Sequence, residues 1–268
     1  MGALDRKKLI ERVAQNDEDR VLLAHVLDRM LSGAQRNIPA STAFLTGREQ
    51  ELCKALLHAA GISDTCFFGG TETAERKVLC YIPDYYERED YLYSEDGPVC
   101  ALRAEISDYD TLSHRDFLGA ILGMGVKREI LGDLYVSSDH CDMLVLREMA
   151  SYLLSQLTQI GRARVRVSEL PLQELTVPEQ RTKTIRDTVA SMRLDSVLAS
   201  GFQIGRSRAQ SLIASGRVEV NHFPVLKADS AVEEGAVISA RGLGKLRVTA
   251  INGKTRKDRI SLVLDRYL

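Results

Sequence analysis

The chain has 268 residues, of which 44% are hydrophobic and 27% charged, and its formal net charge is −1. This balance is typical of folded globular proteins and excludes the disordered and fibrous classes. No apolar run reaches the roughly 18 residues of a membrane-spanning helix, and the charged N-terminal segment lacks the apolar core of a signal peptide, so we expect a cytoplasmic protein without a membrane partner.

Residues 1–75 are predicted to form an N-terminal helical region. Apolar residues recur at helical spacing over 4–33. A second helix begins after Thr46, whose capping box with Glu49 marks its N-terminus, and it ends at Gly61.

Residues 76–170 are predicted to form a middle domain. The stretch 67–83 predicts a turn followed by a strand, and the acidic, tyrosine-rich stretch 84–97 predicts a surface excursion. Regular elements follow: a strand at 99–106, a helix at 114–125 after a capping box of Ser113 and Asp116, strands at 130–136 and 141–146, a helix at 147–161 and a strand at 162–170. The order β-α-β-β-α-β is that of ferredoxin-like folds, which include RNA-recognition-motif (RRM) domains. The strands lack the paired aromatic residues on which RRM domains stack bases, so we do not expect that mode of binding.

Residues 171–184, which contain two prolines, are predicted to be a linker, and residues 185–268 a small C-terminal domain. The predicted elements of this domain are helices at 193–200 and 207–215 and strands at 218–221, 236–242 and 245–251. The whole chain is therefore predicted to be an α+β protein of three parts.

The five cysteines are scattered and form no CxxC pair, which is against a disulfide framework or a structural zinc site. His140, Cys141 and Asp142 carry ligand-type side chains, but neighbouring residues point in different directions. We expect no metal, no cofactor and a buried cysteine at 141.

No residues form a recognisable catalytic constellation. His114 near Asp116 is the closest approach to an acid/base pair, but no nucleophile accompanies it and the capping turn accounts for both. Lys127 and Arg128, just beyond the end of the same helix, are candidates for a secondary RNA contact.

The charge is divided unevenly along the chain. Residues 181–268 contain 16 Lys and Arg against 8 Asp and Glu, a net charge of +8, whereas residues 1–180 contain 20 against 29, a net charge of −9. Such asymmetry indicates a polyanion-binding module in the C-terminal third.

The strongest functional signal lies at the start of the second C-terminal helix. Arg206 and Ser207 stand at its N-terminus, where unpaired backbone N–H groups and the helix dipole favour an anion, and Arg208 follows on the polar side. Four residues after the two arginines stand a glutamine and a leucine, which offer no carboxylate. We therefore predict a phosphate clamp rather than a solvated helix face.

At these residues the sequence resembles the S-four RNA-binding domain, named for small-subunit ribosomal protein four. The resemblance spans 193–242 and is carried by RLD, SRAQSLI and GRVEVN, and by a last strand in which Ala236 replaces the usual Asp. It implies an αL-type module that holds structured RNA against two helices. The RNA-binding residues that it implies are Arg193, Ser207, Arg208, Gln210, Arg217, Asn221 and Lys227, to which the clamp adds Arg206.

The segments FLTGREQELCKALLHAAG, FFGGTETAERKV and SHRDFLGAILGMGVKREILGDLYV are similar to YlmH-type proteins, so the resemblance extends over nearly the whole chain. It implies a bacterial, non-enzymatic RNA-binding protein that acts on the ribosome, with rRNA and tRNA as partners and a large-subunit role in translation quality control and the rescue of stalled ribosomes. We expect a monomer. Two alternatives stay open: an RNA-modifying enzyme anchored by the C-terminal domain, and a protein-interaction scaffold linked to cell division.

Overall fold

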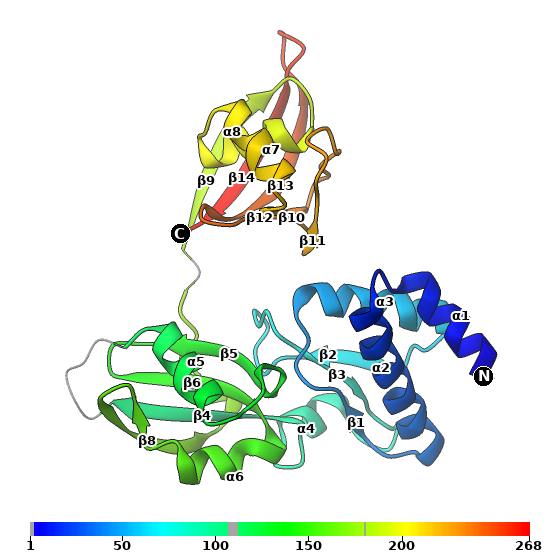
Figure 1. Cartoon of the computed structure of the whole chain (residues 1–268), viewed down its shortest axis with the longest axis vertical. Coiled ribbons are helices and arrows are strands. Elements are labelled where there is room, and N and C mark those ends of the chain that lie inside the picture. The colour runs from blue at the N-terminus through cyan, green and yellow to red at the C-terminus, as the bar shows by residue number, and fades with distance from the viewer. Residues whose placement is uncertain (1–2, 107–111, 180) are drawn as a thin grey trace. The chain divides into compact units, whose positions relative to one another are not determined.

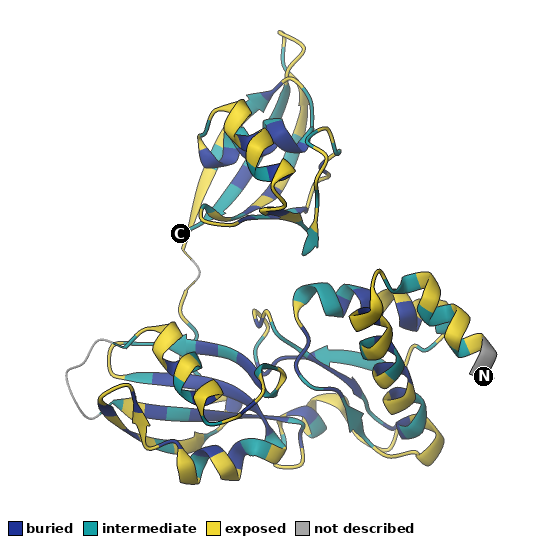
Figure 2. Cartoon of the chain, viewed as in Figure 1, coloured by how far each residue is buried: buried dark blue, intermediate teal, exposed yellow. Residues whose placement is uncertain are grey.

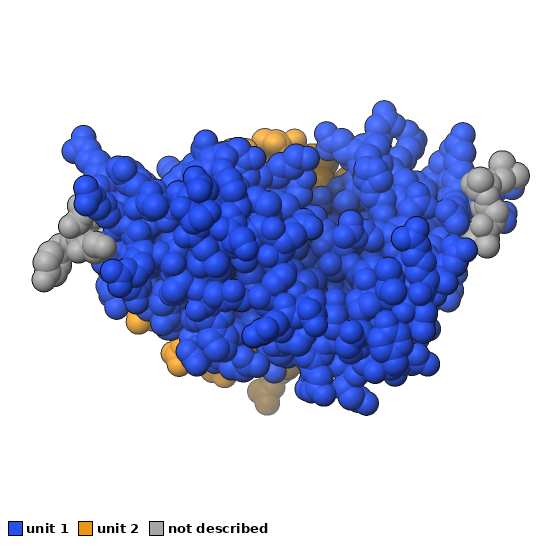
Figure 3. Space-filling view, turned by 90° about the horizontal axis from the view of Figure 1, so that it is seen from below, with its two compact units in different colours: residues 1–178 blue, residues 179–268 orange. Residues whose placement is uncertain are grey.

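In the computed structural model the chain folds into two compact units, Met1–Pro178 and Glu179–Leu268 (Figures 1 and 3). The structure describes residues 3–106, 112–179 and 181–268. Each unit has its own buried apolar core, which Figure 2 shows in dark blue.

The first unit begins with helices packed around a small sheet. Its first elements are α1 (Ala3–Val13), α2 (Asp17–Arg36), β1 (Ala40–Ser41), α3 (Gly47–Ala60), β2 (Thr65–Phe68), β3 (Val78–Tyr81) and α4 (Arg88–Tyr93). Strands β1, β3 and β2 pair in that order. The helical pattern predicted over 4–33 is broken into two helices, because Asn16 accepts a hydrogen bond from the Asp19 N–H at 2.8 Å and caps the start of α2.

Both predicted capping boxes are present. Thr46 Oγ1 accepts from the Glu49 N–H at 3.3 Å, while the Glu49 carboxylate accepts from the Thr46 N–H at 2.6 Å. Ser113 and Asp116 make the same exchange at the start of α5 (His114–Gly123). Two side chains thus fix the first turn of each helix.

The middle of the chain forms the predicted β-α-β-β-α-β order. Its elements are β4 (Val99–Ile106), α5, a 3-10 turn (Arg128–Ile130), β5 (Leu131–Val136), β6 (His140–Leu146), α6 (Arg147–Gln156), β7 (Gln159–Ile160) and β8 (Ala163–Leu170). The strands lie in the order β5-β6-β4-β8-β7, and helices α5 and α6 pack against them (Figure 1). Phe117 and Ile121 of α5 and Leu153 of α6 belong to one buried cluster with the strand residues, so both helices cover the same face. Helix α6 ends at Gln156, before the predicted residue 161, because the residues that follow turn into the short strand β7 and pair with β8.

The opposite face of this sheet is partly covered by the N-terminal part of the unit. Phe44, Phe68 and Leu92 pack with the strand residues Val99 and Leu144 in one buried cluster. Helix α4 lies in the stretch predicted to be a surface excursion. Ten of the fourteen residues from 84 to 97 are exposed, while Leu92 of the helix is buried. Residues on both sides of the boundary predicted at 75 therefore belong to one compact unit.

Arg76 forms hydrogen bonds with both the N-terminal part of the unit and the middle sheet. Its Nε donates to the Leu131 carbonyl and its Nη2 to the Phe44 carbonyl, both at 2.9 Å. A side chain at Gly132 would clash with Phe44, since a Cβ there would lie 2.8 Å from Phe44 Cζ. The aromatic ring therefore sits directly against the strand.

The described residues of the second unit form one sheet and two helices. Its elements are β9 (Thr182–Val189), α7 (Leu194–Phe202), α8 (Arg206–Ala214), β10 (Val218–Val220), β11 (Phe223–Pro224), β12 (Val237–Ala240), β13 (Gly244–Lys254) and β14 (Ile260–Tyr267). The strand order is β11-β10-β12-β13-β14-β9, and Leu198 of α7 and Ile213 of α8 are buried in the core.

Strand β9 begins at Thr182, inside the stretch predicted to be a linker. It pairs with β14 from Thr182 opposite Tyr267 to Val189 opposite Ile260. The sequence of β9 is mostly polar because it is an edge strand, so it lacks the apolar alternation that predicts a strand. Residue 180, also in the predicted linker, lies outside the described residues.

Candidate nucleic-acid interface

Helices α7 and α8 meet at one buried carboxylate, Asp195, in the first turn of α7. Its side chain is fully buried. Arg193 Nε lies 3.3 Å from Oδ1, Arg206 Nε lies 3.0 Å from Oδ2, and Gln210 Nε2 donates to Oδ2 at 2.8 Å. Three of the residues predicted to bind RNA therefore converge on Asp195.

The electrostatics of this cluster leave it positive. Burial raises the pKa of the Asp195 carboxyl, but the hydrogen bonds from Gln210, Arg206 and Arg193 outweigh burial and hold the pKa well below its usual range. One ionised carboxylate thus faces two guanidinium groups. The side chains of Arg193 and Arg206 are 40% and 53% exposed, so each keeps an outer face toward solvent.

The prediction that Arg206 has no acidic partner was wrong. Asp195 of the neighbouring helix α7 pairs with Arg206. The two residues are eleven positions apart in the chain, so the helical spacing within α8 gives no sign of the pair. The pair fixes the position of the guanidinium at the start of α8. Arg206 therefore has a structural role that a free cation would not have.

Arg208 and Ser207 do fit the prediction of an open helix start. Arg208 is exposed and makes no hydrogen bond or ion pair with any residue that the structure describes. Ser207 is exposed as well, and the N-cap residue Gly205 supplies no capping side chain. The backbone N–H groups of the first turn thus remain available beside an unpaired arginine.

Arg217 follows the turn at Gly216, where φ is 68°, and leads into β10. Its Nη2 lies 3.3 Å from the Arg241 carbonyl oxygen. Arg241 was not among the residues predicted to bind RNA. It lies beside Arg217 because strands β10 and β12 pair Val218 with Ala240. Both arginines are exposed, and neither forms an ion pair within the described part of the chain.

Asn221 and Lys227 occupy different settings. Asn221 and His222 have φ values of 49° and 70° and form a two-residue turn between the paired residues Val220 and Phe223. The Asn221 Oδ1 accepts from the Val237 N–H at 2.9 Å, so this side chain holds the turn against β12. Lys227 is exposed and has no side-chain partner among the residues described.

Lys127 and Arg128, the two candidates for a secondary RNA contact, lie in different environments. Arg128 donates to the Leu131 carbonyl at 2.7 Å, and burial lowers the pKa of its guanidinium. Its side chain is therefore used inside the fold. Lys127 is exposed, with its Nζ 3.9 Å from a Glu129 carboxylate oxygen.

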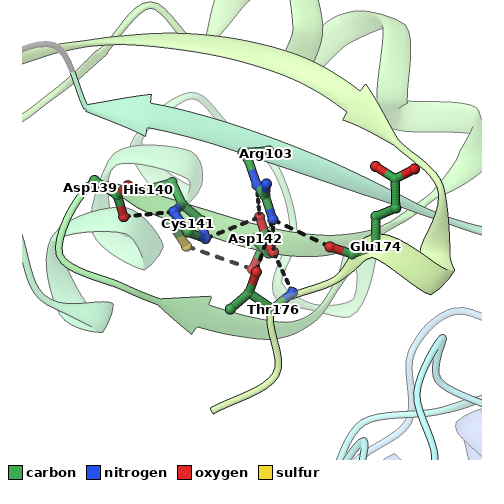
Figure 4. Close-up of polar contacts among 7 residues, drawn as sticks. All are labelled: Arg103, Asp139, His140, Cys141, Asp142, Glu174 and Thr176. Atoms are coloured by element: carbon green, nitrogen blue, oxygen red, sulfur yellow. Dashed lines mark hydrogen bonds and ion pairs between the residues drawn. The ribbon is translucent and has the colours of Figure 1, made fainter.

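A polar cluster in the middle domain forms hydrogen bonds with the segment that follows β8 (Figure 4). Asp142 is fully buried and receives two hydrogen bonds from Arg103, at 2.6 and 2.7 Å. It also accepts from the Thr176 N–H at 2.8 Å. The neighbouring Cys141 is buried, as predicted, and burial raises its pKa.

Asp116, one of the residues considered for catalysis, has a structural role. The Asp116 carboxylate caps α5, and its hydrogen bonds from Ser113 lower its pKa. Across the described ranges, no group of three His, Cys, Asp or Glu side chains could hold a metal ion. No helix within those ranges is long and apolar enough to cross a membrane.

Comparisons with known proteins agree with the two parts of this architecture. A family model described as a putative RNA-binding domain in YlmH matches residues 105–174, and a model of the S4 domain matches residues 192–238. The chain is 34% identical over 226 residues to the ribosome-associated protein quality control protein P2 of Bacillus subtilis (strain 168), with 84% of this chain and 86% of that protein covered.

A solved structure is similar to part of the chain. The cell division protein ylmH from Streptococcus pneumoniae matches with a TM-score of 0.50 and 20% identity, covering 62% of this chain and 98% of that one.

Proposed function

The chain belongs to the YlmH family, and on that premise we propose that it binds structured RNA on the ribosome through its C-terminal S4 domain. We further propose that the RNA is rRNA or tRNA at the large subunit, and that binding serves translation quality control on stalled ribosomes. The matched relative is named for ribosome-associated quality control, which supports this assignment.

The observation that carries the proposal is the arrangement of cations around Asp195. Arg193 and Arg206 are positioned by the buried carboxylate and still expose their outer faces. Elsewhere in the same domain Arg208, Arg217 and Lys227 are exposed and have no carboxylate partner in the described part of the chain. Guanidinium groups next to a helix N-terminus are suited to phosphate oxygens.

The contact is expected to recognise phosphates and shape rather than individual bases. The contributing side chains are Arg, Lys, Ser and Gln, with no aromatic ring among them on which a base would stack. Affinity for RNA should therefore fall steeply with salt, because each phosphate contact releases counterions.

Filter binding of the Arg208→Ala/Arg217→Ala variant to purified rRNA and tRNA tests the proposal. Both side chains are exposed, so the fold should be unchanged, while affinity at about 0.1 M KCl should fall on the order of tenfold. The variant Arg12→Ala/Arg36→Ala removes two exposed arginines from the first unit and serves as the matched control. Equal affinities of both variants and the wild type for RNA would contradict RNA binding by the S4 domain.

Sedimentation with separated ribosomal subunits tests the finer assignment. We expect the full chain to sediment with the large subunit and the double variant to stay at the top of the gradient. Sedimentation with the small subunit alone would contradict it.

We propose that the role does not include catalysis. The support is that the best acid/base candidate, Asp116, is occupied as a helix cap. Nucleoside analysis of rRNA incubated with the protein should show no new modified nucleoside, and a new one would favour an RNA-modifying enzyme.

A further inference from the structure

Two cysteines face each other across the small sheet of the first unit. Cys66 lies in β2 and Cys80 in β3, and the antiparallel register of these strands places the two residues directly opposite each other (Figure 1). Phe68 and Val78 form the next pair on the same face, and all four side chains belong to, or pack against, one buried cluster. Both thiols are free. The sheet therefore holds two reduced sulfur atoms at opposed positions.

The strand geometry is compatible with a covalent bond between these cysteines. Directly opposed residues of antiparallel strands have Cα atoms roughly 4.5–5.5 Å apart, and a disulfide spans roughly 4.4–6.8 Å between Cα atoms. The side chains of an opposed pair point to the same side of the sheet. The two thiols already share a hydrogen bond. A disulfide between Cys66 and Cys80 would therefore need no large movement of the backbone.

The two thiols have different environments, which gives them different roles in an oxidation. Cys66 is half-buried, whereas only 1% of Cys80 is exposed. The hydrogen bond from Cys80 lowers the pKa of the Cys66 thiol against the effect of burial, and the positive charge of Arg88 adds to the lowering. The same hydrogen bond and burial raise the pKa of Cys80. Because the thiolate is the nucleophile, Cys66 is the sulfur that an oxidant meets first.

The other three cysteines lack such a partner. Cys100 of β4 is opposite Val145, and Cys141 of β6 is opposite Ala104 on one side. Cys53 lies in α3 and, like the other two, is buried. Burial raises the pKa of all three thiols. Oxidation that joins two cysteines within the chain should therefore be confined to the β2–β3 pair.

We propose that Cys66 and Cys80 are a site of oxidative modification and form a reversible disulfide when the protein meets a hydroperoxide. The Cys66 thiolate attacks one peroxide oxygen and breaks the O–O bond, which gives a sulfenic acid and, after protonation of the leaving oxygen, water or an alcohol. The Cys80 sulfur then attacks the Cys66 sulfur, the S–O bond breaks, and the departing hydroxide takes the Cys80 proton and leaves as water. The two sulfur atoms together lose two electrons, which reduce the peroxide.

The disulfide would join β2 to β3 and close a covalent ring that contains Arg76. The hydrogen bonds of Arg76 to the Phe44 and Leu131 carbonyls connect the N-terminal part of the unit with the middle sheet. Because a cross-link restricts the unfolded chain, the oxidised protein should unfold at a higher temperature than the reduced one. The site lies in the first unit and is independent of RNA binding by the S4 domain.

The test is oxidation of the reduced full-length protein by a small excess of hydrogen peroxide at neutral pH, with no other thiol present. Thiols counted after denaturation should fall from five to three, the intact protein should become two hydrogen atoms lighter, and peptide mapping should join Cys66 to Cys80. Dithiothreitol should restore all five thiols. A disulfide between any other pair, or a Cys66 sulfinic acid beside a reduced Cys80, would overturn the proposal.

Two variants separate the roles of the two sulfur atoms. Cys80→Ser removes the second sulfur and keeps a side chain of similar size, so oxidation should stop at a Cys66 sulfenic acid that dimedone captures, with the loss of one thiol. Cys100→Ala removes a buried cysteine of β4 and is the control, which should still lose two thiols and form the Cys66–Cys80 bond. Loss of two thiols in Cys80→Ser would show that Cys80 is not the partner of Cys66.

Discussion

Arg206 at the start of α8 donates from Nε to the buried Oδ2 of Asp195 in α7 at 3.0 Å. This pair divides the predicted clamp into two classes of residue. Arg193, Arg206 and Gln210 surround the carboxylate and hold the two helices together, whereas Arg208, Arg217 and Lys227 are exposed and form no ion pair with the residues that the structure describes. The two classes should respond differently to mutation.

Replacing the carboxylate should destabilise the second unit. In Asp195→Asn the buried charge is lost and two guanidinium groups remain beside it, which should lower the free energy of unfolding by about 2–3 kcal/mol. This is below the full value for a buried pair because both arginines are 40–53% exposed. Urea unfolding of the wild type and Asp195→Asn at neutral pH measures this difference in unfolding free energy.

The same variant should show a defined pH dependence. The native pKa of Asp195 is depressed, so its stabilising effect is present above the unfolded carboxyl pKa of about 4 and is lost as the pH falls through the native value. The difference between wild type and Asp195→Asn should therefore be constant from neutral pH to about 5 and shrink below about 4. A difference that is independent of pH would contradict the ionised carboxylate.

Arg206→Ala and Arg208→Ala should separate stability from binding. Arg206→Ala removes a partner of the buried Asp195 and should cost about 1–2 kcal/mol of unfolding free energy. Arg208→Ala removes an exposed, unpaired side chain, so stability should change by less than about 0.5 kcal/mol while RNA affinity falls. Equal stability losses in the two variants would argue against the division into two classes.

The turn at Asn221 offers a prediction that is independent of RNA. Asn221→Ala loses the hydrogen bond to the Val237 N–H and places alanine at a φ of 49°, which should cost about 1–2 kcal/mol of unfolding free energy. Asn252→Ala, at an exposed asparagine in β13, is the control and should change stability by less than about 0.5 kcal/mol. An Asn221→Ala variant as stable as the control would show that the turn does not need this side chain.

Cys66 should be the most reactive thiol. The hydrogen bond with Cys80, directly opposite on β3, lowers the pKa of Cys66 to about 7 against the effect of burial, and Arg88 adds to the lowering. Burial raises the pKa of Cys53 to about 12 and that of Cys100 to about 11. Iodoacetamide at neutral pH should therefore label Cys66 first, because the thiolate is the nucleophile.

The labelling rate of Cys66 should rise as the pH passes through about 7, and Cys80→Ala should move that rise to higher pH. Mass spectrometry of the labelled peptides measures both. Labelling of Cys53 as fast as that of Cys66 would contradict the assignment.

Much of the fold could be predicted from local patterns. The capping boxes at Thr46 and Ser113 mark helix starts through side chains only three residues apart, and the strands and helices from 99 to 170 follow from apolar periodicity. Strand β14 has an apolar alternation, although it is not among the predicted strands. The polar edge strand β9 carries no such signal.

The site was harder to predict because its defining contact is tertiary. Asp195 meets Arg206 and Gln210 only when α7 and α8 pack together, so spacing within α8 gives no indication of the pair. The proximity of Arg217 to Arg241 depends in the same way on the register of β10 and β12. The motif at 193–242 identified the right domain, but it did not distinguish residues that hold the domain together from residues that face outward.

Cross-linking of the full-length protein to bacterial ribosomes, followed by identification of the cross-linked peptides, tests the central claim most directly. The account predicts RNA cross-links on peptides that contain Arg208, Arg217 or Lys227. Cross-links confined to residues 1–178, with none in the C-terminal unit, would contradict RNA binding by the S4 domain.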